Sequence, residues 1–270
     1  MNGAGLNGAG REDGVVVREL HSIEEFGAVF RLFDRIWRPQ PGGAPITVEM
    51  MRALSHAGNY VAGAYLGGRL VGASVGFLAA PAGRSLHSHI TGAATGGGIG
   101  FALKLHQRAW ALDRGLETIT WTYDPLVRRN AHFNLAKLGA RPEEYLPCFY
   151  GSMDDAINAG DESDRVLAVW RLRESHVLAA ARREPAPGRV PPGAVPGLRD
   201  GGGRPLPGRT DAPAVLVAVP EDIETMRAED PRAAREWRLA VRDVLGGLLR
   251  DGARVTGFYD RSCYIVERPR

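Results

Sequence analysis

The sequence predicts an α/β fold in which a sheet is flanked by helices, followed by a smaller αβ C-terminal extension. Short apolar runs rich in β-branched residues alternate with stretches of helical periodicity through residues 14–175. A glycine-rich turn stands between an expected strand and an expected helix. A segment crowded with proline and glycine, residues 183–213, is expected to be a loop or linker before an extension over 214–270.

Composition restricts the class of protein. The chain has 270 residues, of which 44% are hydrophobic and 24% charged, and no apolar run approaches the roughly 18 residues of a membrane span. Residues 1–13 lack the basic and apolar segments of a signal peptide, so we expect them to be disordered and the protein to be soluble and cytoplasmic. The net charge is only +3 and arginine is scattered, which argues against nucleic acid as a partner. Cys148 and Cys263 have no metal-ligand spacing, so we expect no metal.

The N-terminal elements are predicted from caps and apolar runs. Ser22 and Glu25 form a capping-box signature for a helix that runs to Trp37, and Thr47 is the expected cap of the next helix. The expected order is a strand over 14–19, the helix to residue 37, a helix over 48–56, and a hairpin of strands 59–66 and 70–78 joined by Gly67 and Gly68.

The remaining elements follow the same alternation. A strand over 85–91 precedes the glycine-rich turn, and a helix with Ile99, Leu103, His106 and Trp110 on one face ends at Gly115. We then expect a strand over 117–123, a helix over 126–138 that Gly139 stops, and a strand over 166–171. The extension is expected to contain a strand over 214–219, a helix over 231–250 and a hairpin over 254–266.

The glycine-rich turn is a candidate pyrophosphate cradle. Glycines without a Cβ let successive backbone N–H groups converge on an anion, and the N-terminus of the following helix adds a partial positive charge. The alternatives are a plain flexible connection and a Rossmann dinucleotide loop. The second fits poorly, because the turn comes late in the chain and after a hairpin. The residues concerned are Thr95, Gly96, Gly97, Gly98, Ile99 and Gly100.

The element order and several motifs resemble the GNAT acyltransferase superfamily. The motifs are Ser88-His89, GIGFALK at 98–104, TWTYDPLVRRNAHFNLAKLGA at 120–140, YLPCFYG at 145–151, Ser163-Asp164-Arg165, VPED at 219–222 and the helix over 232–252. They are most similar to a branch of predicted GNAT enzymes resembling amino-acid N-acyl (succinyl) transferases. The resemblance implies a central mixed, largely antiparallel twisted sheet, and a loop that binds the pyrophosphate of acetyl-CoA or another acyl-CoA as co-substrate.

The sequence departs from the pattern of that family in three ways. Thr95 stands where an arginine or glutamine usually precedes the first glycine, and the stretch from His89 to Gly96 is shortened. Backbone donors would then supply most of the hydrogen bonds to the phosphates. Leu135 stands where many GNAT enzymes have a tyrosine that protonates the leaving thiolate, so another acid or solvent has to serve.

His89 and Asp124 are the candidates for catalytic proton handling, because one precedes the cradle and the other ends the strand over 117–123. Asp124 has two further interpretations. It could bind the ammonium group of an amino-acid substrate, or it could be a turn residue, since Asp-Pro favours turn initiation. The alternative for His89 is a buried core histidine.

Four further residues are candidates for binding. Asn130 and Asn134 are four apart and share a helix face, so they are assigned to the cofactor, with a solvated face or a cap as the alternative. Tyr150 and Arg165 are assigned to a substrate carboxylate, which arginine binds with two parallel hydrogen bonds. An ion pair of Arg165 with Asp164 or with another surface acid is the more ordinary alternative.

These features predict an N-acyltransferase that moves an acetyl, succinyl or similar group from acyl-CoA to the amine of an amino acid or related small molecule, by direct attack and without a metal. No nucleic-acid or membrane partner is expected, and a homodimer is left open. One alternative is a GNAT-like module with a degenerate CoA loop that acts as a binding or scaffold protein. Another is reuse of the fold for other chemistry on a biosynthetic intermediate.

Overall fold

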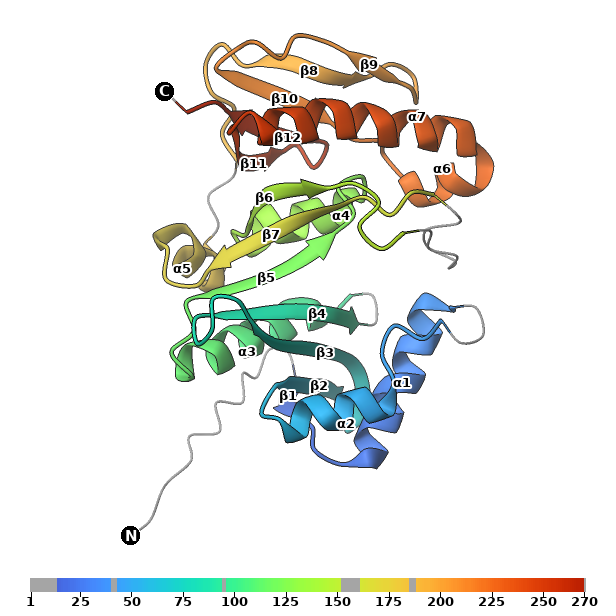
Figure 1. Ribbon diagram of the computed structural model, residues 1–270, viewed down its shortest axis with the longest axis vertical. Helices are drawn as coiled ribbons and strands as arrows, with labels where there is room; N and C mark the ends of the chain where they lie inside the picture. Colours follow the sequence, from blue (N-terminus) through green and yellow to red (C-terminus); the bar gives the residue numbers. More distant parts are fainter. Residues whose placement is uncertain (1–13, 40–42, 94–95, 152–160, 185–187, 270) are drawn as a thin grey trace. The chain divides into compact units, whose positions relative to one another are not determined.

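The computed structural model describes residues 14–39, 43–93, 96–151, 161–184 and 188–269 (Figure 1). The predicted disordered segment 1–13 lies outside the described residues. The chain forms two compact units, residues 1–119 and 120–270. Within the described residues, no helix is both long and apolar enough to cross a membrane.

The first unit contains four strands that pair in chain order, each antiparallel to the next. The strands are β1 (Val15–Glu19), β2 (Tyr60–Leu66), β3 (Arg69–Ala79) and β4 (Ser85–Ala93), and the helices are α1 (Ile23–Trp37), α2 (Val48–His56) and α3 (Ile99–Asp113). All seven elements lie where the sequence predicts them, with ends that differ by two residues at most.

The predicted capping box at the start of α1 is present. The Ser22 hydroxyl accepts a hydrogen bond from the Glu25 N–H at 3.2 Å, and the Glu25 carboxylate accepts one from the Ser22 N–H at 3.0 Å. These two bonds satisfy backbone donors that have no partner within the helix. The helix then buries one apolar face in the core of this unit, through Phe26, Val29, Leu32 and Phe33.

Helices cover both faces of this antiparallel sheet. Gly92 of β4 faces Trp37 of α1, and its strand neighbour Ala73 belongs to the core around α1. Gly72 of β3 instead faces Ile99 and Leu103 of α3. Because successive residues of a strand point to opposite faces, α1 and α3 cover opposite faces of the sheet.

The second unit contains two groups of strands. In one, β5 (Thr118–Tyr123), β7 (Arg165–Arg171) and β6 (Arg141–Leu146) are neighbours in that order, and β6 and β7 are antiparallel. The other is a five-stranded mixed sheet in the order β11 (Arg254–Tyr259), β12 (Cys263–Glu267), β10 (Ala214–Ala218), β8 (Val195–Asp200) and β9 (Pro205–Pro207). Only the β8–β10 pair is parallel among these described neighbours.

The helices of this unit connect its strands (Figure 1). They are α4 (Arg128–Ala131), continued by the π-helix η1 (His132–Lys137), α5 (Ser175–Ala181), α6 (Ile223–Glu229), α7 (Pro231–Val241), the π-helix η2 (Arg242–Gly246) and α8 (Gly247–Arg250). The predicted helix over 231–250 is thus one helical run of three segments. The predicted α/β fold with a helix-flanked sheet and a smaller αβ C-terminal part is confirmed.

The C-terminal half contains strands that the sequence prediction did not include. The expected linker 183–213 contains β8 and β9, which join the five-stranded sheet. Proline hides these strands in the sequence, but it is tolerated at a sheet edge, where β9 lies. The segments 120–175 and 214–270 belong to the same compact unit. Strand β6 and helices α5 and α6 have no counterpart in the prediction.

A substitution at Gly92 tests the packing of α1 on the sheet. A Cβ at this position would meet two ring atoms of Trp37 at 2.6 and 2.8 Å, and a rigid ring cannot bend away as the end of a flexible side chain would. We expect Gly92→Ala to lower the free energy of unfolding by about 1–3 kcal/mol, the usual cost of overpacking. Urea unfolding followed by circular dichroism measures it.

Gly27→Ala in helix α1 is the matched control in the same unit. Its Cβ would meet only the flexible end of Arg31, at 3.4 Å. Alanine should raise stability there by about 0.5–1 kcal/mol, because glycine is a poor helix former. Equal effects of the two substitutions would contradict the packing described for Gly92.

Candidate functional site

The glycine turn of the first unit has a backbone that only glycine adopts easily. Gly96, Gly97 and Gly98 have φ angles of 92°, 62° and 67°, all in the left-handed region. All three are exposed, whereas Ile99, the first residue of α3, is buried. Thr95, assigned to the same site, lies outside the described residues.

Helix α3 begins at this turn. Its N-cap is Gly98, which as a glycine has no side chain to accept a hydrogen bond from the first turn. The first amides of a helix have no partner inside the helix, and they lie at its partially positive end. The turn therefore presents backbone donors and a favourable electrostatic field to an anion.

His89 lies at a bulge in β4. Val75 pairs with Ile90 and Phe77 pairs with His87, so two residues of β4, Ser88 and His89, oppose the single Gly76. Bulges redirect side chains and are common beside active sites. His89 is exposed. The alternative that it is a buried core histidine is therefore wrong, and its catalytic role stays a prediction.

The neighbouring His87 is the partly buried histidine of this strand. Its ring centroid lies 5.3 Å from that of Phe77, and the ring of His89 lies 6.0 Å from the same phenylalanine. Burial lowers the pKa of His87 to about 4, and the charges of His89 and Lys104 act in the same direction. His87 is therefore uncharged at neutral pH. Of the two histidines, only His89 is exposed to solvent.

A buried polar cluster, not predicted from the sequence, connects the bulge to helix α3. Lys104 donates to the Ser88 hydroxyl at 2.9 Å and to the Gln107 side-chain carbonyl at 3.2 Å. Gln107 in turn donates to Ser74 at 3.3 Å. Burial lowers the pKa of Lys104 to about 7. The cluster fixes the bulged residue Ser88, the neighbour of His89, to the same helix that begins at the glycine turn.

In the second unit, Asp124 is buried between two arginines. Its carboxylate accepts from both terminal nitrogens of Arg238 at 2.8 Å and from Arg227 at 2.5 Å. Burial alone would raise the pKa of Asp124, but the charge and hydrogen bonds of Arg238 and the charge of Arg227 hold it well below its ordinary value. A carboxylate of such low pKa accepts a proton poorly.

The turn interpretation of Asp124 is supported by its local contacts. The Leu126 N–H donates to the Asp124 carboxylate at 2.9 Å across Pro125. Together with the arginine contacts, this bond favours a structural role for Asp124 over proton transfer.

The two arginines also bind a second carboxylate. Asp161 accepts from Arg227 at 3.1 Å and from Arg238 at 2.8 Å. Asp124, Asp161, Arg227 and Arg238 together form what we call the arginine clamp. Sequence reasoning missed the clamp, although Arg238 shares the apolar face of its helix with Ala234, Trp237 and Val241. An arginine on an apolar helix face is a signal for a buried ion pair.

A third arginine, Arg242, holds the next acidic pair. It donates to Asp164 at 2.6 Å and also binds Glu162. The Tyr145 hydroxyl donates to Asp164 at 2.7 Å. The Cys148 thiol lies near enough to Glu162 and Asp164 for the three to ligate a metal ion. In this structure the guanidinium of Arg242 supplies the cation that these carboxylates bind.

Tyr150 and Arg165, the residues assigned to a substrate carboxylate, lie beside one another. The Arg165 guanidinium is 5.5 Å from the centroid of the Tyr150 ring, and the Tyr150 hydroxyl shares a 2.9 Å hydrogen bond with Thr122. Arg165 donates to the backbone carbonyl of Asp164 at 2.8 Å. The carboxylate of Asp164 instead binds Arg242, so the ordinary ion pair expected for Arg165 with that carboxylate is not the observed contact.

The argument that placed Asn130 and Asn134 on one helix face does not apply to the observed backbone. Residues 132–137 form the π-helix η1, in which the hydrogen bonds span five residues, as from Leu138 N–H to the Phe133 carbonyl. Asn134 is buried and Asn130 is half-buried. The cofactor-binding role of the two residues stays a prediction.

Comparisons with known proteins gave matches among solved structures. The ribosomal-protein-S18-alanine N-acetyltransferase from Escherichia coli is 12% identical, and the match covers 60% of this chain and 96% of that one with a TM-score of 0.48. RimJ from Mycobacterium smegmatis, in complex with CoA-disulfide, is 24% identical, with coverages of 63% and 87% and a TM-score of 0.47. The acetyltransferase of GNAT family from Streptococcus pneumoniae is 15% identical, and the match covers 57% of this chain and 97% of that one with a TM-score of 0.46.

No protein-family model matches the chain, and neither does any curated protein. The superfamily that the sequence motifs resemble is the one named for the Streptococcus pneumoniae structure.

Neutralising Asp124 tests the arginine clamp. In Asp124→Asn the buried Arg227 and Arg238 lose a charge partner, so we expect the free energy of unfolding at pH 7 to fall by about 3–5 kcal/mol. Because the folded-state pKa of Asp124 lies below its ordinary value of 3.8, its contribution is complete above that value and is lost as the pH falls below it. The variant should therefore lose less stability than the parent protein between pH 5 and pH 3.

Urea unfolding at several pH values measures both effects. Asp243→Asn is the control, because this carboxylate is exposed and has no ion pair among the described residues. A loss of stability in Asp124→Asn no larger than in the control would show that the clamp does not stabilise the fold.

Proposed function

We propose that this protein is a GNAT-type N-acyltransferase that moves an acetyl, succinyl or similar group from acyl-CoA to the amine of an amino acid or related small molecule. The observation that carries the proposal is the run of three left-handed glycines, Gly96 to Gly98, from which helix α3 begins. Backbone amides in this arrangement suit a pyrophosphate. The resemblance of the sequence motifs to GNAT acyltransferases implies that this pyrophosphate belongs to coenzyme A.

The residues present fit such a co-substrate without a basic side chain in the turn. A residue with a side chain at position 96, 97 or 98 would have to adopt a positive φ, which strains its backbone. Glycine adopts this backbone without strain, and its N–H groups are available as donors. Asn130 and Asn134 are further candidates for contacts with the pantetheine arm.

The proposed chemistry is direct attack of a neutral amine on the thioester carbonyl. A new C–N bond forms, the C–S bond breaks, and the amine loses one proton. We assign that proton to His89, because Asp124 is held ionised by the arginine clamp and is a poor base. Leu135 is buried and has no proton to give, so the leaving thiolate takes its proton from solvent.

Tyr150 and Arg165 are the proposed contacts of the acceptor carboxylate. Arg165 is buried and its guanidinium lies against the Tyr150 ring, an orientation that limits its freedom before an acceptor binds. A fixed guanidinium binds a carboxylate with less loss of side-chain entropy than a mobile one. This assignment favours an amino acid over a simple amine as the acceptor.

The first experiment is calorimetric titration of the purified protein with acetyl-CoA and with succinyl-CoA. Binding with a Kd on the order of micromolar, a usual range for enzyme substrates, would support the proposal and select the donor for an amine screen. Absence of binding by either donor would contradict it and favour the degenerate module or the use of the fold for other chemistry.

Gly98→Asp tests the assigned cradle, with Gly98→Asn as its matched control. Both side chains are of similar size and both residues tolerate the left-handed backbone better than most, so the pair differs chiefly in charge. We expect the aspartate to weaken acyl-CoA binding at least tenfold more than the asparagine does, because it repels the phosphates. Calorimetry with the donor selected above measures this ratio, and equal affinities of the two variants would exclude the turn as the phosphate site.

His89→Asn tests the assigned base. Loss of a general base lowers kcat by about 10²–10⁴-fold, while the Kd of acyl-CoA should stay the same because the substitution leaves the cradle intact. His56→Asn, an exposed histidine of α2, is the control and should keep full activity. A kcat of His89→Asn within twofold of that of His56→Asn would remove His89 from the mechanism.

A further inference from the structure

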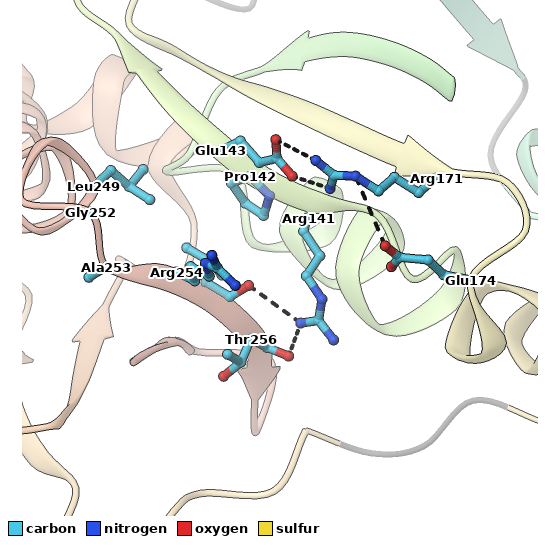
Figure 2. A pocket seen from close by; sticks show the side chains of 11 residues that line it. Arg141, Pro142, Glu143, Arg171, Glu174, Leu249, Gly252, Ala253, Arg254 and Thr256 are labelled. Atoms are coloured by element: carbon cyan, nitrogen blue, oxygen red, sulfur yellow. Dashed lines mark hydrogen bonds and ion pairs between the residues drawn. The ribbon is translucent and has the colours of Figure 1, made fainter. Parts of the chain in front are cut away.

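A cavity lies within the second unit, and none of its lining residues is assigned to acyl transfer. It has a volume of about 700 Å³ and is lined by residues of β6, the end of β7, the start of α5, the end of α8 and β11 (Figure 2). This volume is in the range of sites for small molecules, about 300–1,000 Å³. The charged lining residues are Arg141, Glu143, Arg171, Glu174 and Arg254.

Both glutamates of this cavity, Glu143 and Glu174, form ion pairs with the same arginine, Arg171. Arg171 donates to Glu143 with two nitrogens, one of them at 3.0 Å, and its Nε lies 4.0 Å from Glu174. Figure 2 shows Arg171 between the two carboxylates. The other two arginines of the lining, Arg141 and Arg254, form no ion pair with these glutamates.

Arg141 reaches from β6 to the backbone of β11. Its Nη1 donates to the Thr256 carbonyl and, at 3.4 Å, to the Val255 carbonyl (Figure 2). Both acceptors are neutral, and within the described residues Arg141 makes no ion pair. Burial lowers the pKa of this guanidinium, while the charges of Glu174 and Glu267 raise it. A half-buried cation whose hydrogen bonds go only to neutral carbonyls is well suited to an anionic partner.

Arg254 adds a second charge at the same cavity. It is exposed at the start of β11, and it has neither a hydrogen bond nor an ion pair within the part of the chain that the structure describes. Glu267 of β12 is its cross-strand partner in the ladder but does not line the cavity. Three arginines thus face two glutamates around a space large enough for a small molecule.

We propose that this cavity binds a small molecule carrying a carboxylate or phosphate group, held by the guanidinium groups of Arg141 and Arg254. Arginine binds both groups with paired N–H donors, and a volume of about 700 Å³ suits a metabolite. The site is independent of the proposed acyl transfer, since none of its residues is assigned to that chemistry. Its ligand would act as an effector or as a second substrate of the chain.

The test titrates the full-length protein with inorganic phosphate and, separately, with succinate at constant ionic strength. We expect saturable binding of at least one of them. Binding of phosphate alone indicates a phosphoryl ligand, and binding of succinate alone indicates a carboxylate ligand. The proposal would be overturned if neither ligand saturates the protein at about 10 mM. A Kd of that size corresponds to less than about 3 kcal/mol of binding free energy.

Three variants assign any observed binding to the cavity. Arg254→Gln removes a charge without removing an intramolecular hydrogen bond, so it should fold normally and weaken binding at least about tenfold. Arg173→Gln, an exposed arginine outside the cavity, is the matched control and should bind as the parent protein does. Equal affinities of these two variants would overturn the assignment.

The third variant, Gly98→Asp, separates this cavity from the glycine turn, which could also attract phosphate. Binding that survives Gly98→Asp and is weakened by Arg254→Gln belongs to the cavity. Binding that Gly98→Asp abolishes belongs to the turn and contradicts the cavity proposal, while leaving the proposed acyltransferase function in place.

Discussion

The arginine clamp is the interaction on which the second unit depends. Asp124 ends β5, whereas Arg227 and Arg238 come from α6 and α7, more than a hundred residues later in the chain. Buried charges are tolerated only when they are paired and hydrogen-bonded, so each member of the clamp requires the others. The end of β5 and the C-terminal helices are therefore constrained to fold together, which explains why residues 120–175 and 214–270 form one compact unit.

The clamp also determines what the neighbouring side chains can do. Because the arginines hold the pKa of Asp124 below its ordinary value, its carboxylate is a poor base near neutral pH, and its negative charge acts on Arg165. That charge opposes the effect of burial on the pKa of Arg165 and helps to keep the guanidinium protonated. An aspartate that would be a catalytic residue by its position in the sequence instead stabilises an arginine suited to binding a carboxylate.

The sequence predicts local structure well where a local signal exists. The Ser22–Glu25 capping box, the Thr47 cap and the glycine stop at Gly139 each involve residues close in sequence, and each appears at the expected place. The strands β8 and β9 were not predicted, because their pairing depends on β10 and their prolines imitate a linker. The arginine clamp was missed for the same reason, since no local pattern connects Asp124 with residues 227 and 238.

The candidate site shows the same division between local and distant signals. Three glycines before a helix are visible in the sequence, and glycine permits the left-handed backbone that the structure shows for them. The exposure of His89 was not predictable, because it results from a bulge opposite Gly76 and from the contact of Ser88 with the buried Lys104. Nor was the π-helix η1 predictable, although it alters the spacing argument for Asn130 and Asn134.

The two proposed anion sites differ in the kind of group that would bind the anion. The glycine turn offers backbone amides, which carry no net charge and whose donors are fixed by the φ angles of Gly96 to Gly98. The cavity offers the full charges of Arg141 and Arg254, one half-buried and the other exposed to solvent. Salt screens the attraction between an exposed arginine and an anion strongly. It has less effect on hydrogen bonds from fixed backbone amides that contact the ligand directly. Occupancy of the cavity should therefore respond to ionic conditions more than occupancy of the turn does, which gives the chain a way to bind two anionic ligands independently.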